Sequence, residues 1–239
     1  MEIRGERECK QCGTRWSYYD TGEVTCPECG SAFSVGVDDG RKRHTDHAPE
    51  FDLSDVRTAA ANRPVRDAAD EAVDVTREYV RERGFVSGGD LLELDDEYLA
   101  AQELRHVAGD LSRALDVDED EEYYFLTLVR GADGGQRPDT DAVADTLRPA
   151  RGLAYASAVE AYRDDVRKWL DAQDEDYPDV LAVLERLDDH VRRVEALDGD
   201  VSLDEIEGLV AAARDVGRAL REDDESALDD AVERLAALG

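Results

Sequence analysis

Residues 9–30, CKQCGTRWSYYDTGEVTCPECG, contain all four cysteines of the chain. Cys9 and Cys12 are separated by two residues, as are Cys26 and Cys29, and thirteen residues lie between the two pairs. Each Cys-x-x-Cys can bend into a knuckle that presents two thiolates about 2.3 Å from a zinc ion, while the segment between them returns as a hairpin. The spacing therefore predicts one structural zinc ion, bound by these four cysteines.

The residues around the cysteines support this interpretation. Gly13 and Gly30 each follow the second cysteine of a pair, where glycine permits the positive φ that closes a knuckle and lets backbone N–H groups point at sulfur. We expect Phe33 to pack with Trp16 under the metal. Three short strands are predicted, at TRWSYYD (14–20), EVTC (23–26) and SAFSV (31–35), with DTGE (20–23) as the turn between the first two.

Residues 6 to 35 resemble the zinc ribbon at the N-terminus of archaeal transcription factor B and of many small archaeal zinc-ribbon proteins. The resemblance rests on Cys9, Cys12, Gly13, Cys26, Pro27, Cys29 and Gly30. In that transcription factor the ribbon docks on RNA polymerase and precedes a reader loop and two cyclin-like domains, whereas this chain continues with a shorter, acidic, helical region. As a whole the chain looks like a member of a haloarchaeal zinc-ribbon family with an acidic helical C-terminal region.

The sequence gives less support to other roles for the cysteines. A catalytic zinc site keeps one position open for water, but four thiolates fill the tetrahedron. A thioredoxin-like centre needs a Cys-x-x-Cys in a βαβ setting, which is missing here. The charged start, MEIRGERECK, lacks the apolar core of a signal peptide, so we expect a cytoplasmic protein, whose reducing environment disfavours structural disulfides. A rubredoxin-like iron site uses similar knuckles and stays open on spacing alone.

The composition is strongly acidic, with 29 basic and 60 acidic side chains and a formal net charge of −31 over 239 residues. Such a surface repels nucleic acid and anionic membranes, and no stretch approaches the roughly 18 apolar residues of a membrane span. The preference for arginine over lysine and the evenly distributed carboxylates resemble proteins of salt-in halophilic archaea. In molar salt the Debye length is about 3 Å, so the self-repulsion of the fold is screened.

Residues 36–53, GVDDGRKRHTDHAPEFDL, are interpreted as a linker between two units, because they combine glycine, proline and mixed charge without periodicity. The only basic cluster of the chain lies here, at Arg41, Lys42 and Arg43. With Arg15 it forms the candidate set for nucleic-acid contact, although the nearby acidic residues favour a solvated hinge. His44 and His47 are interpreted as surface residues instead of metal ligands.

Apolar residues recur at helical intervals from Ser54 onward, which predicts a helical bundle over residues 54–239. Ser54 is the expected N-cap, Pro64 divides the first segment, and Gly84 follows its end. Further helices are predicted at about 95–115, 119–130 and 226–238. The most regular apolar seams comprise Tyr155, Val159, Tyr162, Val166 and Trp169; Val180, Leu184, Leu187, Val191 and Val194; and Leu203, Ile206, Val210, Ala213 and Leu220.

Candidate sites within the helices have plainer explanations. The aromatic stripe of Tyr155, Tyr162 and Trp169 is interpreted as core packing. Glu103 and His106 match half of a di-iron motif, but the second Glu-x-x-His pair is missing. The acidic stretch 116–122 lacks the glycine of an EF-hand and is interpreted as a helix start.

The sequence thus predicts a small zinc ribbon of three short β-strands (1–35), a linker (36–53) and an acidic all-α bundle (54–239). We expect a non-enzymatic, zinc-binding interaction or adaptor protein that meets protein partners, with no catalytic residues and no membrane contact; the helices also offer a surface for self-association. A nucleic-acid-binding or transcription-associated regulator is the alternative. Residues 1–35 carry a net charge of −2 against −29 for the rest, so the ribbon is the end better suited to meet a polyanion.

Overall fold

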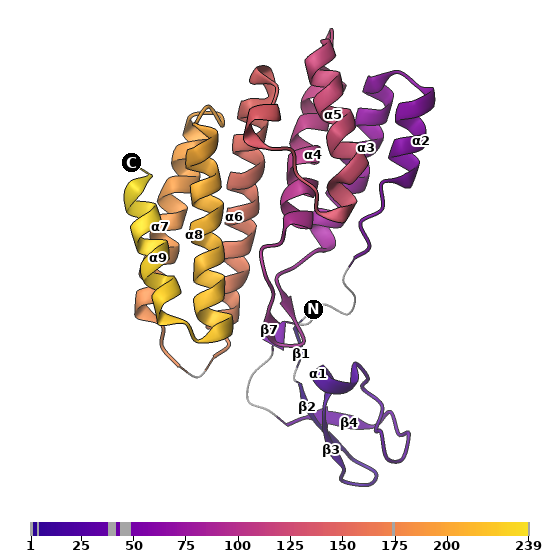
Figure 1. Ribbon diagram of the computed structural model, residues 1–239. Helices are drawn as coiled ribbons and strands as arrows, with labels where there is room; N and C mark the ends of the chain where they lie inside the picture. Colours follow the sequence, from indigo (N-terminus) through magenta and orange to yellow (C-terminus); the bar gives the residue numbers. More distant parts are fainter. Residues whose placement is uncertain (1, 4, 38–41, 44–48, 174, 239) are drawn as a thin grey trace.

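The computed structural model describes residues 2–3, 5–37, 42–43, 49–173 and 175–238 (Figure 1). A small group of strands carries the four cysteines near the N-terminus, and a region of helices follows it. This arrangement confirms the predicted fold class. Among the described residues, no helix is both long enough and apolar enough to cross a lipid bilayer.

The sheet that carries the cysteines is antiparallel, with the strand order β3-β2-β4. Its strands are β2 (Glu6–Cys9), β3 (Arg15–Ser17) and β4 (Ser34–Gly36). In the register, Trp16 of β3 lies opposite Arg7 of β2, and Val35 of β4 lies opposite Glu8. The central strand β2 therefore leads into the first knuckle and ends at Cys9. The sequence analysis predicted no strand at this position.

The three strand predictions differ from the structure: 14–20 is too long, 23–26 is wrong, and 31–35 corresponds to β4 at Ser34–Gly36. The predicted strand 14–20 stops at Ser17, where the helical turn α1 (Tyr18–Thr21) begins, and EVTC forms no strand. Gly22 explains the difference, because its φ of 69° ends the helical turn and its N–H donates to the Tyr18 carbonyl at 2.8 Å. The segment between the knuckles is consequently a strand and a capped turn, not a two-stranded hairpin.

Residues 36–53, predicted to be a linker, contain some ordered structure. A short antiparallel pair joins β1 (Glu2–Ile3) to β5 (Lys42–Arg43). Farther on, Phe51 and Leu53 are buried in the helical core. Helical packing thus begins slightly before residue 54.

The first half of the helical region consists of α2 (Ser54–Asn62), α3 (Val65–Glu82), the hairpin β6 (Val86–Ser87) and β7 (Asp90–Leu91), α4 (Asp96–Arg113) and α5 (Glu119–Gly131). Pro64 separates α2 from α3, as predicted. Ser54 is the first helical residue and not the N-cap; Asp52 accepts hydrogen bonds from its N–H at 2.8 Å and its hydroxyl at 2.6 Å. Asp118 and Glu121 form a capping box, which confirms the acidic stretch as a helix start.

The second half consists of α6 (Arg148–Leu170), α7 (Pro178–Ala196), α8 (Leu203–Glu222) and α9 (Glu225–Ala237). Short 3-10 turns at Ala132–Gly134, Thr140–Ala142 and Asp145–Leu147 connect it to the first half. The predicted seams are largely buried, including every seam residue of α7. Trp169 is only partly buried, and its indole N–H donates to the Gly89 carbonyl of the β6–β7 hairpin at 2.8 Å.

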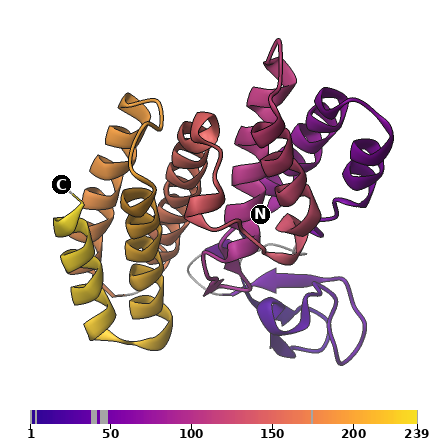
Figure 2. The same ribbon diagram turned by 45° about the horizontal axis from the view of Figure 1, so that its top comes forward.

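Helix α6 joins the two halves, because it packs against α4 on one side and against α7 and α8 on the other. Both views show it between the two groups of helices (Figures 1 and 2). The buried apolar residues from Phe51 to Leu235 form one continuous core. The halves are thus parts of a single packed unit.

The start of α6 meets the turn between α7 and α8 through two glycines. A Cβ atom added at Gly152 would overlap the carbonyl oxygen of Gly199, and Gly199 itself has a φ of 79°. Backbone atoms block the space in this contact, so a side chain at Gly152 could be accommodated only by moving the helix.

Gly152→Ala is therefore expected to lower the free energy of unfolding by about 1–3 kcal/mol, because the methyl group forces α6 away from the turn. Urea denaturation followed by circular dichroism measures the change. Gly109→Ala in α4 is the matched control, since its Cβ would meet only the flexible end of Arg113, at 3.4 Å, and alanine favours a helix. Equal losses in the two variants would contradict this account of the contact.

Candidate metal centre

The two knuckles have the same backbone geometry. In the first, the Cys9 N–H donates to the Thr14 carbonyl at 2.9 Å, and the Gly13 N–H donates to the Cys9 carbonyl at 2.9 Å. In the second, the Cys26 N–H donates to Ser31 at 2.9 Å, and the Gly30 N–H donates to Cys26 at 2.8 Å. The φ angles of Gly13 and Gly30 are 74° and 69°, so both glycines adopt the left-handed conformation predicted from the sequence.

The knuckles bring the four sulfur atoms together. All four Sγ atoms lie within 4.8 Å of one another. Across the knuckles, Cys9 Sγ is 3.6 Å from Cys29 Sγ, and Cys12 Sγ is 3.5 Å from Cys26 Sγ. A tetrahedral ion with metal–sulfur bonds of about 2.3 Å would place neighbouring sulfurs about 3.8 Å apart. The donor set and its spacing therefore fit a four-coordinate metal ion.

Nearby polar groups stabilise negative charge on the sulfurs. The Gln11 N–H donates to Cys9 Sγ at 3.4 Å, and Cys12 Sγ lies 3.2 Å from the Thr14 hydroxyl oxygen. Hydrogen bonds from the Thr14 hydroxyl and backbone lower the pKa of the Cys12 thiol to about 6. A backbone hydrogen bond from Ser31 acts in the same direction on Cys29, but Cys12 and burial together raise the pKa of Cys29 to about 12. Four thiolates this close repel one another, so a divalent cation is what allows all of them to ionise.

Trp16 covers the buried side of the cluster. It forms a small core with Cys9 and Cys26, and its indole N–H donates to the Glu23 carbonyl at 3.1 Å. The predicted packing of Phe33 on Trp16 is wrong, since Phe33 is 78% exposed. Its neighbour Ser34 lies opposite Cys9 in the register, on the face of the sheet that Trp16 occupies, so alternation along the chain turns Phe33 away from the metal centre.

Among the candidate nucleic-acid residues, Arg15 is paired with an acidic side chain. Arg15 pairs with Glu8 at 2.9 Å, and the Lys10 ammonium lies 3.6 Å from the same carboxylate. Hydrogen bonding to Arg15 and the charges of both cations keep the pKa of Glu8 below its usual value. Lys42 and Arg43 form β5, whereas Arg41, His44 and His47 lie outside the described residues. Glu8 thus partly offsets the charge of Arg15.

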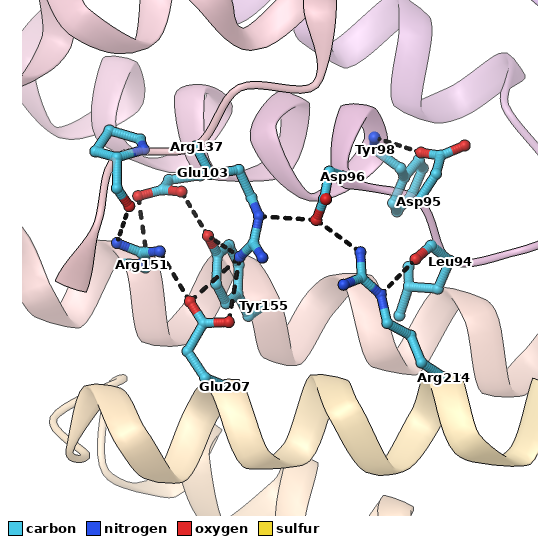
Figure 3. A network of polar contacts seen from close by, with 11 residues as sticks. Leu94, Asp95, Asp96, Tyr98, Glu103, Arg137, Arg151, Tyr155, Glu207 and Arg214 are labelled. Carbon is cyan, nitrogen blue, oxygen red and sulfur yellow. Dashed lines mark hydrogen bonds and ion pairs between the residues drawn. The ribbon is translucent and has the colours of Figure 1, made fainter. Parts of the chain in front are cut away.

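A buried polar network lies in the helical region, where sequence reasoning predicted only core packing (Figure 3). Its centre is Glu103 of α4, which is fully buried and accepts hydrogen bonds from the hydroxyls of Tyr124 and, at 2.7 Å, Tyr155. Arg151 of α6 is 2% exposed; its Nε lies 3.6 Å from Glu103, and its Nη2 donates to Glu207 of α8 at 2.8 Å. The network therefore joins α4, α5, α6 and α8.

Two further arginines extend the network toward the surface. Arg137, in the connection before α6, donates to Tyr155 at 2.7 Å and to Asp96 at 3.0 Å. Arg214 of α8 donates to the same Asp96 oxygen at 2.7 Å and to the Leu94 carbonyl at 2.8 Å (Figure 3). These contacts connect the two halves of the helical region through side chains as well as through the apolar core.

Glu103 and His106, which match half of a di-iron motif, have separate environments. Burial raises the pKa of Glu103 despite its contact with Arg151, and both of its oxygens accept hydrogen bonds from tyrosines. Burial lowers the pKa of His106 to about 4. Within the part of the chain that the structure describes, the four cysteines are the one group arranged to hold a metal ion.

Residues 1–235 match the model of a family of unknown function, DUF7117. The chain belongs to this family. No curated protein and no solved structure matches the chain. The DUF7117 match includes the cysteine cluster and reaches into α9, so the family is defined over the sheet and the helices together.

Proposed function

We propose that the four cysteines bind one structural zinc ion and that the protein is a non-enzymatic adaptor whose zinc-stabilised ribbon meets a protein partner. The observation that carries the proposal is the convergence of four sulfurs from two matching knuckles. Four thiolates complete a tetrahedron and leave no coordination position for a substrate or a catalytic water. The metal then stabilises a segment too small to bury a sufficient core of its own.

The proposal includes the type of ribbon and its surroundings. Two glycine-closed knuckles and a three-stranded sheet support a ribbon of the archaeal transcription factor B type. The net charge of −31 supports a salt-rich cytoplasm, in which the charged surface is screened. A reducing cytoplasm also keeps the cysteines available as metal ligands.

Protein purified without chelator is expected to contain one equivalent of zinc per chain, because the four thiolates provide one tetrahedral site. Elemental analysis of zinc and iron together measures this content. Less than about half an equivalent of zinc, with iron also absent, would contradict the metal assignment, whereas one equivalent of iron would favour a rubredoxin-like site.

Duplex DNA and single-stranded RNA are expected to bind weakly or not at all in 1 M KCl. The helical region carries most of the net charge of −31, and Arg15 is already paired with Glu8. Even four or five phosphate contacts would lose about four decades of affinity between 0.1 M and 1 M salt. Fluorescence anisotropy with labelled oligonucleotides tests this expectation. Tight binding in 1 M KCl that the Cys26→Ser variant loses would favour the nucleic-acid-binding alternative.

A further inference from the structure

The four cysteines differ in their access to solvent. Cys12 and Cys29, the second cysteine of each knuckle, are exposed. Cys9 and Cys26 are buried and pack against Trp16, so a reagent from solvent reaches the cluster on the side that this ring leaves open. An accessible thiolate reacts with peroxides, whereas a buried sulfur is inert. Oxidation of the cluster should therefore begin at one of the two exposed cysteines.

Each exposed sulfur lies close to a buried sulfur of the other knuckle. Cys12 Sγ is 3.5 Å from Cys26 Sγ. Cys29 Sγ is 3.6 Å from Cys9 Sγ. A disulfide bond is about 2.0 Å long, and a side-chain rotation can bring two sulfurs together from these distances. A cysteine oxidised at the exposed side therefore has a second sulfur beside it, the arrangement that is typical of redox-sensing cysteines.

We propose that the metal centre is a peroxide-sensitive switch, in which a disulfide formed across the two knuckles releases the zinc ion and unfolds the ribbon. The inference rests on the zinc-dependent adaptor function proposed above and adds a regulation of the same site. The helices stay folded, because their core from Phe51 to Leu235 contains no ribbon residue. Peroxide thus separates the adaptor from its partner without destroying the rest of the protein.

The oxidation proceeds in two steps. The thiolate of Cys12 or Cys29 attacks one oxygen of hydrogen peroxide, the O–O bond breaks, and a sulfenic acid and a hydroxide ion form. The facing buried thiolate, that of Cys26 or Cys9, then attacks the oxidised sulfur, and the S–O bond breaks with loss of a second hydroxide ion. The two sulfurs lose two electrons in total, which reduce the peroxide.

The disulfide removes two of the four zinc ligands, because the thiolate is the form of cysteine that binds the metal. Two remaining thiolates do not complete a structural site, and the folding energy that zinc supplies is lost with the ion. Hydrogen peroxide is small and uncharged, so neither the net charge of −31 nor the salt concentration hinders its approach.

The test follows the full-length, zinc-loaded protein in 1 M KCl after addition of hydrogen peroxide. One zinc ion per chain should be released to a chromogenic chelator, and the emission of Trp16 should shift to the red while helical circular dichroism is retained. Mass spectrometry of proteolytic peptides should find disulfides that join residues 9–12 to residues 26–29. Dithiothreitol reduces a disulfide to two thiols, so dithiothreitol with added zinc should restore the starting signals.

The double variant Cys12→His, Cys29→His replaces both exposed thiolates and keeps a Cys2His2 ligand set, which also binds zinc. It should release zinc about tenfold or more slowly in peroxide, because its two remaining sulfurs are buried. Cys29→His alone keeps a Cys3His set and should form one disulfide, Cys12–Cys26. Glu28→Gln, an exposed change between two ligands, should release zinc as the wild type does.

Several outcomes would overturn the inference. These are zinc retained by the wild type in excess peroxide, disulfides confined to single knuckles, oxidation to sulfinic or sulfonic acid without a disulfide, or a double variant that loses zinc as fast as the wild type. Each leaves the adaptor function standing, because the ion is present before oxidation. A protein that contains no zinc before peroxide is added would instead contradict the proposed metal site.

Discussion

Cys26→Ser is expected to abolish zinc binding and to unfold the ribbon while the helices remain folded. A serine hydroxyl does not replace a thiolate ligand, and structural zinc contributes about 10–16 kcal/mol to the folding of small zinc-finger peptides. The helical region has its own continuous core from Phe51 to Leu235, which contains no ribbon residue. The loss should therefore be confined to the sheet and the knuckles.

Zinc content, tryptophan fluorescence and far-ultraviolet circular dichroism together measure this outcome. Trp16 is 7% exposed beside Cys9 and Cys26, so its emission should shift to the red, whereas Trp169 of α6 should be unaffected. Glu28→Gln is the matched control, because Glu28 is exposed between two ligands of the second knuckle. A collapse of the helical signal together with zinc loss would refute the independence of the helices.

Arg151→Met is expected to lower the free energy of unfolding by about 3–5 kcal/mol, because it leaves the carboxylate of Glu103 buried without its nearest cation. Methionine retains much of the side-chain volume but removes the contacts with Glu103, Glu207 and the Pro138 carbonyl. Arg148→Met is the control on the same helix. The Arg148 side chain is 52% exposed and pairs with Asp145 at the surface, a contact worth about 0–1 kcal/mol.

The destabilisation by Arg151→Met should also depend on pH. Burial already raises the folded-state pKa of Glu103 above its unfolded value, and removal of Arg151 raises it further. Below the unfolded pKa the carboxyl group is protonated in both proteins. As pH rises, the wild type ionises beside Arg151, whereas the variant must either bury an unpaired charge or retain the proton. The free energy of unfolding of Arg151→Met should therefore fall further below that of the wild type at pH 8 than at pH 4.

Urea denaturation at the two pH values tests this expectation. Adding Glu103→Gln to Arg151→Met should recover part of the lost stability, because the neutral amide needs no counter-charge. Equal destabilisation by Arg151→Met and Arg148→Met, or a deficit that shrinks as pH rises, would show that Glu103 does not depend on Arg151.

The features predicted correctly from the sequence are those that local rules determine. Each knuckle is defined within five residues by two cysteines and the glycine that follows them. The hydrogen bonds from Gly13 and Gly30 to the first cysteine of each pair show this. Helix seams follow from the 3.6-residue period, and Pro64 interrupts the first helical segment whatever the rest of the chain does. Each of these signals lies within one element.

The features that were missed depend on pairing between distant segments. Strand β2, EREC, has no alternation of apolar residues and is ordered by its neighbours β3 and β4. The orientation of Phe33 depends on the register of β4 with β2, which the sequence does not specify. A tendency of EVTC toward a strand was overridden by the capped turn at Gly22.

The buried network was missed for a related reason. Glu103 and Arg151 lie in different helices, and Arg137 lies in an irregular connection, so no periodic pattern relates them. A usable signal was present in α6, where Arg151 falls one turn before Tyr155 on the same apolar seam. A charged residue on a buried seam requires a partner of opposite charge elsewhere in the core.

The network places a limit on how the chain can be divided. Glu103 belongs to the first half of the helical region, while Arg151 and Glu207 belong to the second. A fragment that ended after α5 would keep an interior acid without its nearest cation, whereas a fragment that began at α6 would keep Arg151 paired with Glu207 but would lose its contacts with Glu103 and the Pro138 carbonyl. The first half alone would therefore bury an unpaired carboxylate, and the second half alone would lose part of the network. A piece of the helical region that keeps every contact of this network must extend from α4 to α8.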